Sequence, residues 1–128
     1  MRLVLPLCLL VVALIHVAPL AGVLGARHLA SLYGVRVSDP NLDILLRHRA
    51  VLFGILAALL AAATVVEPLR TAAMAAGGVS VLSFLGVAWL VGEHNGAIRR
   101  VVVADWLALV PLTVAAVLHW GSARGLWH

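Results

Sequence analysis

The sequence has very little charge for its length, and this shortage excludes most classes of soluble protein. Charged residues make up 11% of the 128 residues, whereas apolar residues make up 64%. A soluble globular domain carries roughly 25% charged residues, because it needs them to cover its surface. Five acidic and nine basic residues cannot cover a soluble domain of this size. We therefore expect hydrocarbon to surround most of the chain.

Lysine is absent, and cysteine occurs once. All nine basic residues are arginines dispersed along the chain, so the net charge of +4 does not indicate a nucleic-acid surface. Arginines beside apolar segments are suited to contact lipid phosphates. The lone Cys8 excludes an intramolecular disulfide. The sequence also lacks a phosphate-binding glycine loop and a zinc-spaced cluster. It therefore indicates no metal, no cofactor and no nucleic-acid partner.

What the chain does contain is four long apolar stretches. They cover residues 3–26, 50–66, 71–92 and 101–120. About 20 helical residues, at about 1.5 Å each, cross a hydrocarbon core of about 30 Å. We therefore predict an all-α integral membrane bundle, one domain over residues 1–128, with four transmembrane helices at about 3–25, 41–66, 71–93 and 99–120.

The first stretch has an alternative interpretation as a cleaved signal peptide. Its basic region is a single arginine, and its apolar run exceeds the usual core of about 7–15 residues. No clean small-x-small cleavage site follows it. Cys8 is a poor lipidation site, because it lies close to the N-terminus and follows Pro6. We expect the first helix to be retained.

The first connection carries structural signals of its own. Residues 27–33 can form a short helix in the membrane interface that ends at Gly34, with Leu29, Leu32 and Tyr33 against lipid.

The start of the second span has a clear capping signal. Pro40 suits the first position of a helix, and it leaves the carboxylate of Asp39 free to cap that helix. The second span should therefore begin near residue 40, which puts Asp43 and Arg47 on its first turns.

The arginines also predict an orientation. An even number of spans puts Arg2, Arg70 and Arg124 on one side of the membrane and the other six arginines on the opposite side. The positive-inside tendency then places both termini on the non-cytoplasmic side of the inner membrane. If Arg47 and Arg49 lie within the helix and are not counted, four arginines remain on the cytoplasmic side against three on the other side.

Small residues mark the faces on which membrane helices pack. In the second span the small face is Arg47, Val51, Gly54, Ala58, Ala61 and Val65. In the third span it is Ala73, Ala76, Ser80, Ser83, Val87, Leu90 and His94. In the fourth span, one face holds Asp105, Leu109, Leu112, Ala116 and His119. We predict that these faces form the interior, with crossings close to those of coiled coils.

Among the polar side chains inside the predicted spans, we single out His16, Ser80 and Ser83. For His16 we expect a neutral ring that donates to a backbone carbonyl. We expect the serines to bond back to helix carbonyls, because no paired base can be assigned to them. No two histidines face each other at similar depth, so the pattern does not favour bis-histidine haem ligation. Pro19 and Pro111 should each bend a helix.

Polar side chains converge where the second span starts, the third ends and the fourth starts. The candidate cluster is Arg47, His48, Arg49, Glu93, His94, Asn95 and Asp105. An unpaired charge at the depth of Asp105 costs roughly 2.5–3.5 kcal/mol or more. We predict Arg47 as its partner, with Asp43 as an alternative partner of Arg47. The cluster could lock two helices, bind a small polar or amphipathic ligand, or conduct ions, and catalytic residues stay unknown.

Four segments carry a resemblance to a known group. They are Arg27 to Gly34, Ser38 to Leu42, Arg47 to Gly54 and Arg99 to Trp106. Together they resemble small bacterial four-helix membrane proteins that are broadly similar to DoxX-like proteins. The resemblance implies a fold and a location, and no activity. Members are often named phosphopantetheine adenylyltransferase, a soluble α/β enzyme with a His-x-x-His or His-x-Gly-His motif. This chain has neither motif, so we reject that activity.

Three functional hypotheses follow from these patterns. The first is a non-catalytic accessory or structural membrane protein, in contact with lipids and able to form a homo-oligomer or to join another membrane protein. The second is a membrane enzyme or redox partner that binds a lipid-like or quinone-like molecule at the polar cluster. The third is a small oligomeric transporter lined by the polar face of the third span.

Overall fold

The computed structural model describes residues 3–125, and within that range every regular element is a helix. The elements are α1 (Val4–Val17), η1 (Ala18–Leu24), α2 (Ala26–Tyr33), α3 (Pro40–Val65), η2 (Glu67–Leu69), α4 (Arg70–Val91) and α5 (Gly96–Ala123). Four stretches are long and apolar enough to cross a membrane: Val4–Leu24, Pro40–Val65, Glu67–Val91 and Gly96–Ala123. The predicted fold is confirmed: the protein is a multi-pass helical membrane protein.

The helix boundaries follow from local chemistry. The Asp39 carboxylate accepts a hydrogen bond from the Asn41 N–H at 2.8 Å, and this bond caps α3 as predicted. Gly34 ends α2 in the left-handed region, with φ of 63°, a conformation that glycine adopts without a Cβ clash. Pro19 lies where α1 changes into the 3₁₀ segment η1. Pro111 lies inside α5, which stays one helix.

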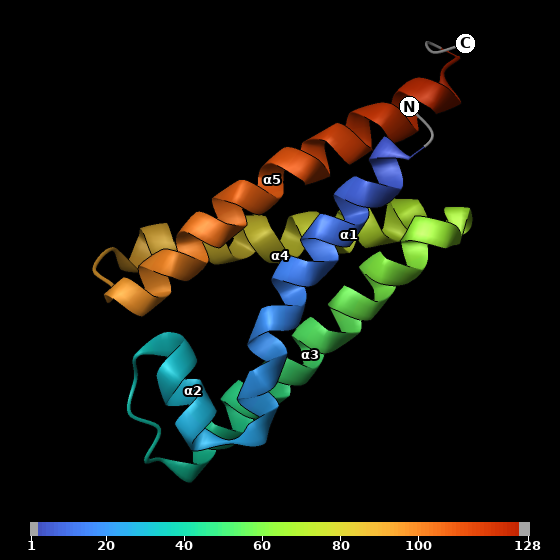
Figure 1. Ribbon diagram of the computed structural model, residues 1–128. Coiled ribbons are helices and arrows are strands. Elements are labelled where there is room, and N and C mark those ends of the chain that lie inside the picture. The colour runs from blue at the N-terminus through green and yellow to red at the C-terminus, as the bar shows by residue number, and fades with distance from the viewer. Residues whose placement is uncertain (1–2, 126–128) are drawn as a thin grey trace.

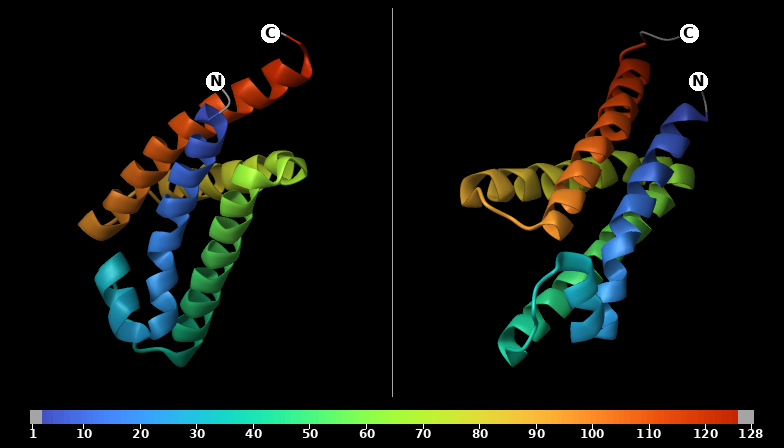
Figure 2. Two further views of the ribbon diagram at one scale, coloured as in Figure 1. Left: turned by 45° about the vertical axis from the view of Figure 1, so that its right-hand side comes forward. Right: turned by 60° about the vertical axis from the view of Figure 1, so that its left-hand side comes forward.

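The helices do not run alongside one another throughout. Figures 1 and 2 show α1 packed beside α3 and α5 passing along α1, while α4 is inclined steeply across α1 and α3. The start of α1 and the end of α5 lie at one end of the molecule, and α2 lies at the other (Figure 1). The inclination of α4 differs from the predicted crossings, which were close to those of coiled coils.

The main core lies towards the end where α1 starts, which we call the closed end. Its buried residues come from α1, α3, α4 and α5: Leu5, Leu9, Val12, Ala13, Leu60, Ala63, Ala73, Met74, Val81, Ala108, Leu112 and Ala115. Five of these residues are alanines, which let helix backbones approach closely. At Gly77 an added Cβ would lie 3.4 Å from the Leu112 side chain. Tight packing therefore holds the four helices together here.

The predicted inward face of α3 is wrong. Val51, Ala58, Ala61 and Val65 are exposed, and Val65 keeps 81% of its surface. The buried residues of α3 are instead Ala50, Ala57, Leu60 and Ala63. Small residues occur on several faces of α3, so their pattern does not distinguish the packed face from the lipid face.

The predicted faces of α4 and α5 are correct in part. Ala73 is buried, but Val87 and Leu90 are exposed because the second half of α4 leaves the core. In α5, Leu112 is buried, and the other members of the predicted face, Asp105, Leu109, Ala116 and His119, are half-buried.

The short helix α2 packs against protein, which corrects the predicted contact of Leu29 and Tyr33 with lipid. Leu29 is fully buried and Tyr33 nearly so. An added Cβ at Gly22 would lie 2.7 Å from Leu29 Cδ2, so this glycine in η1 makes room for the leucine. The helix predicted for this loop is present, and its apolar face covers η1.

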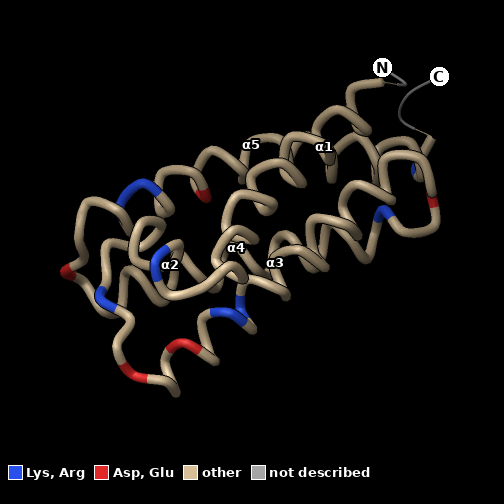
Figure 3. The backbone as a smooth tube through the Cα atoms, turned by 60° about the horizontal axis from the view of Figure 1, so that its bottom comes forward, with Lys and Arg blue, Asp and Glu red and all other residues tan. Residues whose placement is uncertain are grey.

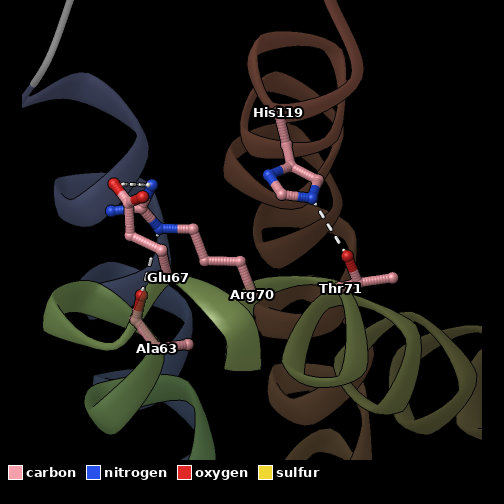
Figure 4. Close-up of polar contacts among 5 residues, drawn as sticks. All are labelled: Ala63, Glu67, Arg70, Thr71 and His119. Carbon is pink, nitrogen blue, oxygen red and sulfur yellow. Dashed lines mark hydrogen bonds and ion pairs between the residues drawn. The ribbon is translucent and has the colours of Figure 1, made fainter. Parts of the chain in front are cut away.

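Most charged residues lie towards the two ends of the molecule (Figure 3). At the end near the termini, Arg70 Nη1 lies 3.0 Å from Glu67 Oε1, and Arg70 Nε donates to the Ala63 carbonyl at 3.3 Å. Thr71 and His119 form a 3.0 Å hydrogen bond that ties α4 to α5 (Figure 4). These bonds lie at or beside the α3–α4 turn, apart from the predicted polar cluster.

Candidate ligand cavity at the open end

The end opposite the closed core, where α2 lies, contains a cavity of about 250 Å³. We call this part of the molecule the open end. Residues from α1, η1, α2, α3, α4 and α5 all contribute to the cavity wall. Most of the wall is apolar, and its polar members are His16, Ser31, Tyr33, Arg100 and Asp105. A largely apolar cavity with a few convergent polar groups is the usual form of a site for a small ligand.

His16 is positioned by its own helix. Its side chain is 2% exposed, and Nδ1 lies 2.9 Å from the Val12 carbonyl oxygen. Because a carbonyl can only accept, Nδ1 carries the proton, and the neutral ring has an acceptor at Nε2. The ring centroid lies 5.9 Å from that of Phe53. The predicted bond from His16 to a backbone carbonyl is confirmed.

Asp105 lies half-buried on α5 in the cavity wall. Its predicted ion pair with Arg47 is wrong. Arg47 instead pairs with Asp43 on the same helix, with Nη2 at 2.9 Å from Oδ2 and Nε at 3.0 Å from Oδ1. Among the residues that the structure describes, no cation lies within ion-pair distance of Asp105. The alternative partner of Arg47 is therefore the correct one, and α3 presents a different arginine to the interior.

That arginine is Arg49, and three aromatic rings surround it. The guanidinium carbon lies 5.4 Å from the ring centroid of Tyr33, 5.1 Å from that of Phe53 and 5.4 Å from that of Phe84. A cation over an aromatic face at this range is attracted by the ring quadrupole. We call Tyr33, Phe53 and Phe84 the aromatic cage; the sequence pattern did not indicate it, because its rings come from three separate helices.

Tyr33 connects the cage to the cavity. Burial raises the pKa of its phenol, and the nearby charge of Arg49 opposes that shift. The phenol is protonated at neutral pH, as an ordinary tyrosine is, so its hydroxyl can donate a hydrogen bond.

Asn95 holds the open end together from outside the cavity. Its Oδ1 accepts a hydrogen bond from the Ile98 N–H at 2.8 Å and caps α5. Its Nδ2 donates to the Tyr33 carbonyl at 2.9 Å and to the Gly34 carbonyl at 3.2 Å. One amide therefore satisfies the start of α5 and the end of α2 together.

The remaining members of the predicted cluster do not join the cavity. His48 and Glu93 are exposed and do not line it. His94 is also exposed, and its Nδ1 lies 2.8 Å from the carbonyl oxygen of Gly92 in the same loop. The predicted cluster is therefore divided: Asp105 lines the cavity, Arg49 lies among the aromatic rings and Asn95 caps α5. The other members are exposed.

A second hollow lies between α3 and α4, on the other side of the aromatic cage. This α3–α4 groove has a volume of about 460 Å³ and is lined by Arg49, Leu52, Phe53, Leu56, Ser80, Ser83, Phe84 and Val87. Ser83 donates to the Ser80 carbonyl at 3.1 Å, which confirms the bond to a helix carbonyl predicted for Ser83. Phe53 and Phe84 belong to the walls of both hollows.

Within residues 3–125, no group of three or more His, Cys, Asp or Glu side chains is placed to hold a metal ion. No family model matches the chain, and neither a curated protein nor a solved structure matches it.

Proposed function

We propose that this protein binds a small amphipathic molecule with a hydroxyl-bearing ring, quinol-like in chemistry, in the cavity at the open end. The observation that carries the proposal is the meeting of His16, Tyr33 and Asp105 around one apolar space. These residues come from α1, α2 and α5, and they lie far apart in the sequence. Simple locking of two helices does not require such a space.

The chemistry of the wall supports this class of ligand. His16 offers an acceptor at Nε2, because Nδ1 is used by Val12. A ligand O–H can donate to that nitrogen, and a second ligand oxygen can accept from the Tyr33 hydroxyl. Phe53 and Phe84 supply ring faces for a flat headgroup. The volume is below the roughly 300–1,000 Å³ of sites for drug-sized ligands, so it suits a headgroup whose tail extends into lipid.

This proposal selects the ligand-binding hypothesis over the accessory and transporter hypotheses. An accessory role would need only the closed core and the Asn95 bonds. A transport path along α4 is disfavoured by the serines, because Ser83 bonds back to its own helix and the groove beside it is lined mainly by apolar side chains. We propose binding, without a catalytic step, in the inner membrane with the termini on the non-cytoplasmic side.

The test is equilibrium binding of a decyl-tailed dimethoxy-methyl hydroquinone to the full chain in a neutral detergent. We expect His16→Phe to weaken binding about tenfold, because one hydrogen bond to a buried group is worth about 1–1.5 kcal/mol. His48→Phe is the matched control, since His48 is exposed at the same end. Equal binding by wild type and His16→Phe, with both folded, would refute the proposed site.

Asp105→Asn provides a second arm of the same test. The substitution preserves shape and removes the charge. Retained helicity with weakened hydroquinone binding is the expected result. Loss of folding with unchanged affinity in the folded fraction would instead support a structural role for Asp105, and it would count against the proposal.

A further inference from the structure

Arg49 retains unused binding capacity in its aromatic cage. A guanidinium carries five N–H donors and a permanent positive charge. Among residues 3–125, no carboxylate lies within ion-pair distance of Arg49, and its side chain donates no hydrogen bond to another residue of the chain. The three aromatic rings attract the cation, but they do not accept hydrogen bonds from the N–H groups in the plane of the guanidinium. An anion with several acceptor oxygens would complement this side chain.

The α3–α4 groove begins at this guanidinium. Its other lining residues are Leu52, Leu56, Val87, two phenylalanines and two serines, and none of them is acidic. Leu52 and Val87 are more than half exposed, so the groove opens sideways towards the surrounding lipid. The groove therefore has a cation at one end and apolar walls that open to hydrocarbon. This arrangement complements an amphipathic molecule with an anionic headgroup and an apolar chain.

We infer that the α3–α4 groove binds one anionic phospholipid, whose phosphate is held by Arg49 and whose acyl chain lies along Leu52, Leu56 and Val87. The planar fork of arginine suits bidentate contact with phosphate oxygens. The cage orients the fork, because Tyr33 on α2, Phe53 on α3 and Phe84 on α4 contact it from three helices. This site is separate from the hydroquinone cavity, although the two share a wall of Phe53 and Phe84.

Arg47 provides a matched comparison on the same helix. It lies two residues earlier, it is exposed, and its charge is already paired with Asp43 at 2.9 Å. Both arginines lie in the first half of α3, so they would contribute equally to a non-specific attraction for anionic lipid. Of these two arginines, only Arg49 combines an unpaired guanidinium with an apolar groove. A specific site should therefore depend on Arg49 far more than on Arg47.

The experiment is native mass spectrometry of the full chain from neutral detergent, titrated with phosphatidylglycerol, phosphatidylcholine or inorganic phosphate. For the wild type we expect one tightly bound phosphatidylglycerol and weaker binding of phosphatidylcholine, and we expect inorganic phosphate not to displace the lipid. Arg49→Gln should lower the affinity for phosphatidylglycerol about tenfold or more, and Arg47→Gln should leave it within about twofold. Equal losses in the two variants, or displacement by inorganic phosphate, would overturn the inference.

A second pair of variants tests the groove without touching the arginine. Val87→Trp fills the groove, and Val79→Trp places the same ring on an exposed part of α4 outside it. We expect only Val87→Trp to weaken phosphatidylglycerol binding, with helicity by circular dichroism unchanged in both. If neither variant affects lipid binding, the acyl chain does not lie in this groove and the inference fails. Hydroquinone binding, measured in parallel, distinguishes this failure from failure of the cavity proposal.

Discussion

The two ends of this molecule are held by different interactions. At the closed end, α1, α3, α4 and α5 pack through alanines and a few large side chains, and the core residues are almost free of exposed surface. At the open end the helices diverge, and α2 is held by the packing of Leu29 on η1, by the Asn95 bonds and by the Arg49 cage. The closed end therefore resembles a packed membrane core, and the open end a polar framework around a cavity.

This difference between the two ends shows where a helical membrane bundle can contain a ligand-binding cavity. In hydrocarbon, apolar side chains gain little from leaving lipid for another helix, so stability comes from close packing and from hydrogen bonds. Close packing leaves no space for a ligand. A cavity can persist only where packing is relaxed and polar contacts take over, as they do around His16 and Asp105.

The largest expected effect is at the closed end. Leu9→Ala removes a side chain with 0% exposure and should lower the free energy of unfolding by about 2–4 kcal/mol, because it leaves a cavity in packed surroundings. Leu52→Ala, at a position with 51% exposure at the open end, should cost less than about 0.5 kcal/mol. Reversible unfolding in mixed micelles measures both. Similar losses would contradict the division into two ends.

The next largest effect is expected from substitutions at Gly22 and Gly54, which differ in whether the neighbouring leucine can move. Gly22→Ala brings a Cβ within 2.7 Å of Leu29 Cδ2, a side chain that is fully buried and cannot move aside. We expect a loss of about 1–3 kcal/mol in the free energy of unfolding. Gly54→Ala brings a Cβ within 2.8 Å of Leu20 Cδ1, but Leu20 is 38% exposed and can rotate away. That change should be neutral within about 0.5 kcal/mol, and the reverse order would show that α2 is loosely seated.

The Asn95 bonds can be separated by two substitutions. Asn95→Ala removes the cap of α5 and the two bonds to α2, so it should lower the free energy of unfolding by about 1–2 kcal/mol. Asn95→Asp keeps an acceptor for the Ile98 N–H and loses only the donor. It should loosen the end of α2 while α5 stays capped, and faster hydrogen exchange at residues 26–33 would report this. Protection of α2 equal to wild type would show that the amide donor is unimportant.

The smallest effect is the titration of Tyr33, the single tyrosine of the chain. Burial raises its pKa above the ordinary value of about 10, so the folded state holds the phenolic proton more tightly than the unfolded state. Its contribution to stability is therefore complete below that ordinary value and is lost as the pH rises through the raised pKa. Phenolate absorbance measures the midpoint. A midpoint at or below the ordinary value would contradict the burial of this ring.

Several features were predictable because they depend on neighbours in the sequence. The apolar stretches gave all four spans, Asp39 and Pro40 gave the start of α3, and Gly34 gave the end of α2. The bond from His16 to Val12 spans one helical turn and follows from the same local geometry. Each of these features depends only on residues within one segment, one helix cap or one helical turn.

The choice between Arg47 and Arg49 could not be predicted in this way. It depends on how far α3 is rotated about its axis, and α3 has small residues on several faces. Ala50, Ala57 and Ala63 face inward, so Arg49 meets Tyr33, Phe53 and Phe84, while Arg47 stays outside with Asp43. The rotation of α3 about its axis is set by how the side chains of all four long helices pack together.

The sequence alone determined that the chain is a membrane protein of four helical spans, where those helices start and stop, and that its charges lie near the ends. These properties follow from hydropathy and from hydrogen bonds within a few residues. Only the tertiary structure decided which arginine enters the interior and that His16, Tyr33 and Asp105 share one cavity. Residues from separate helices meet only after packing has fixed the rotation and tilt of each helix.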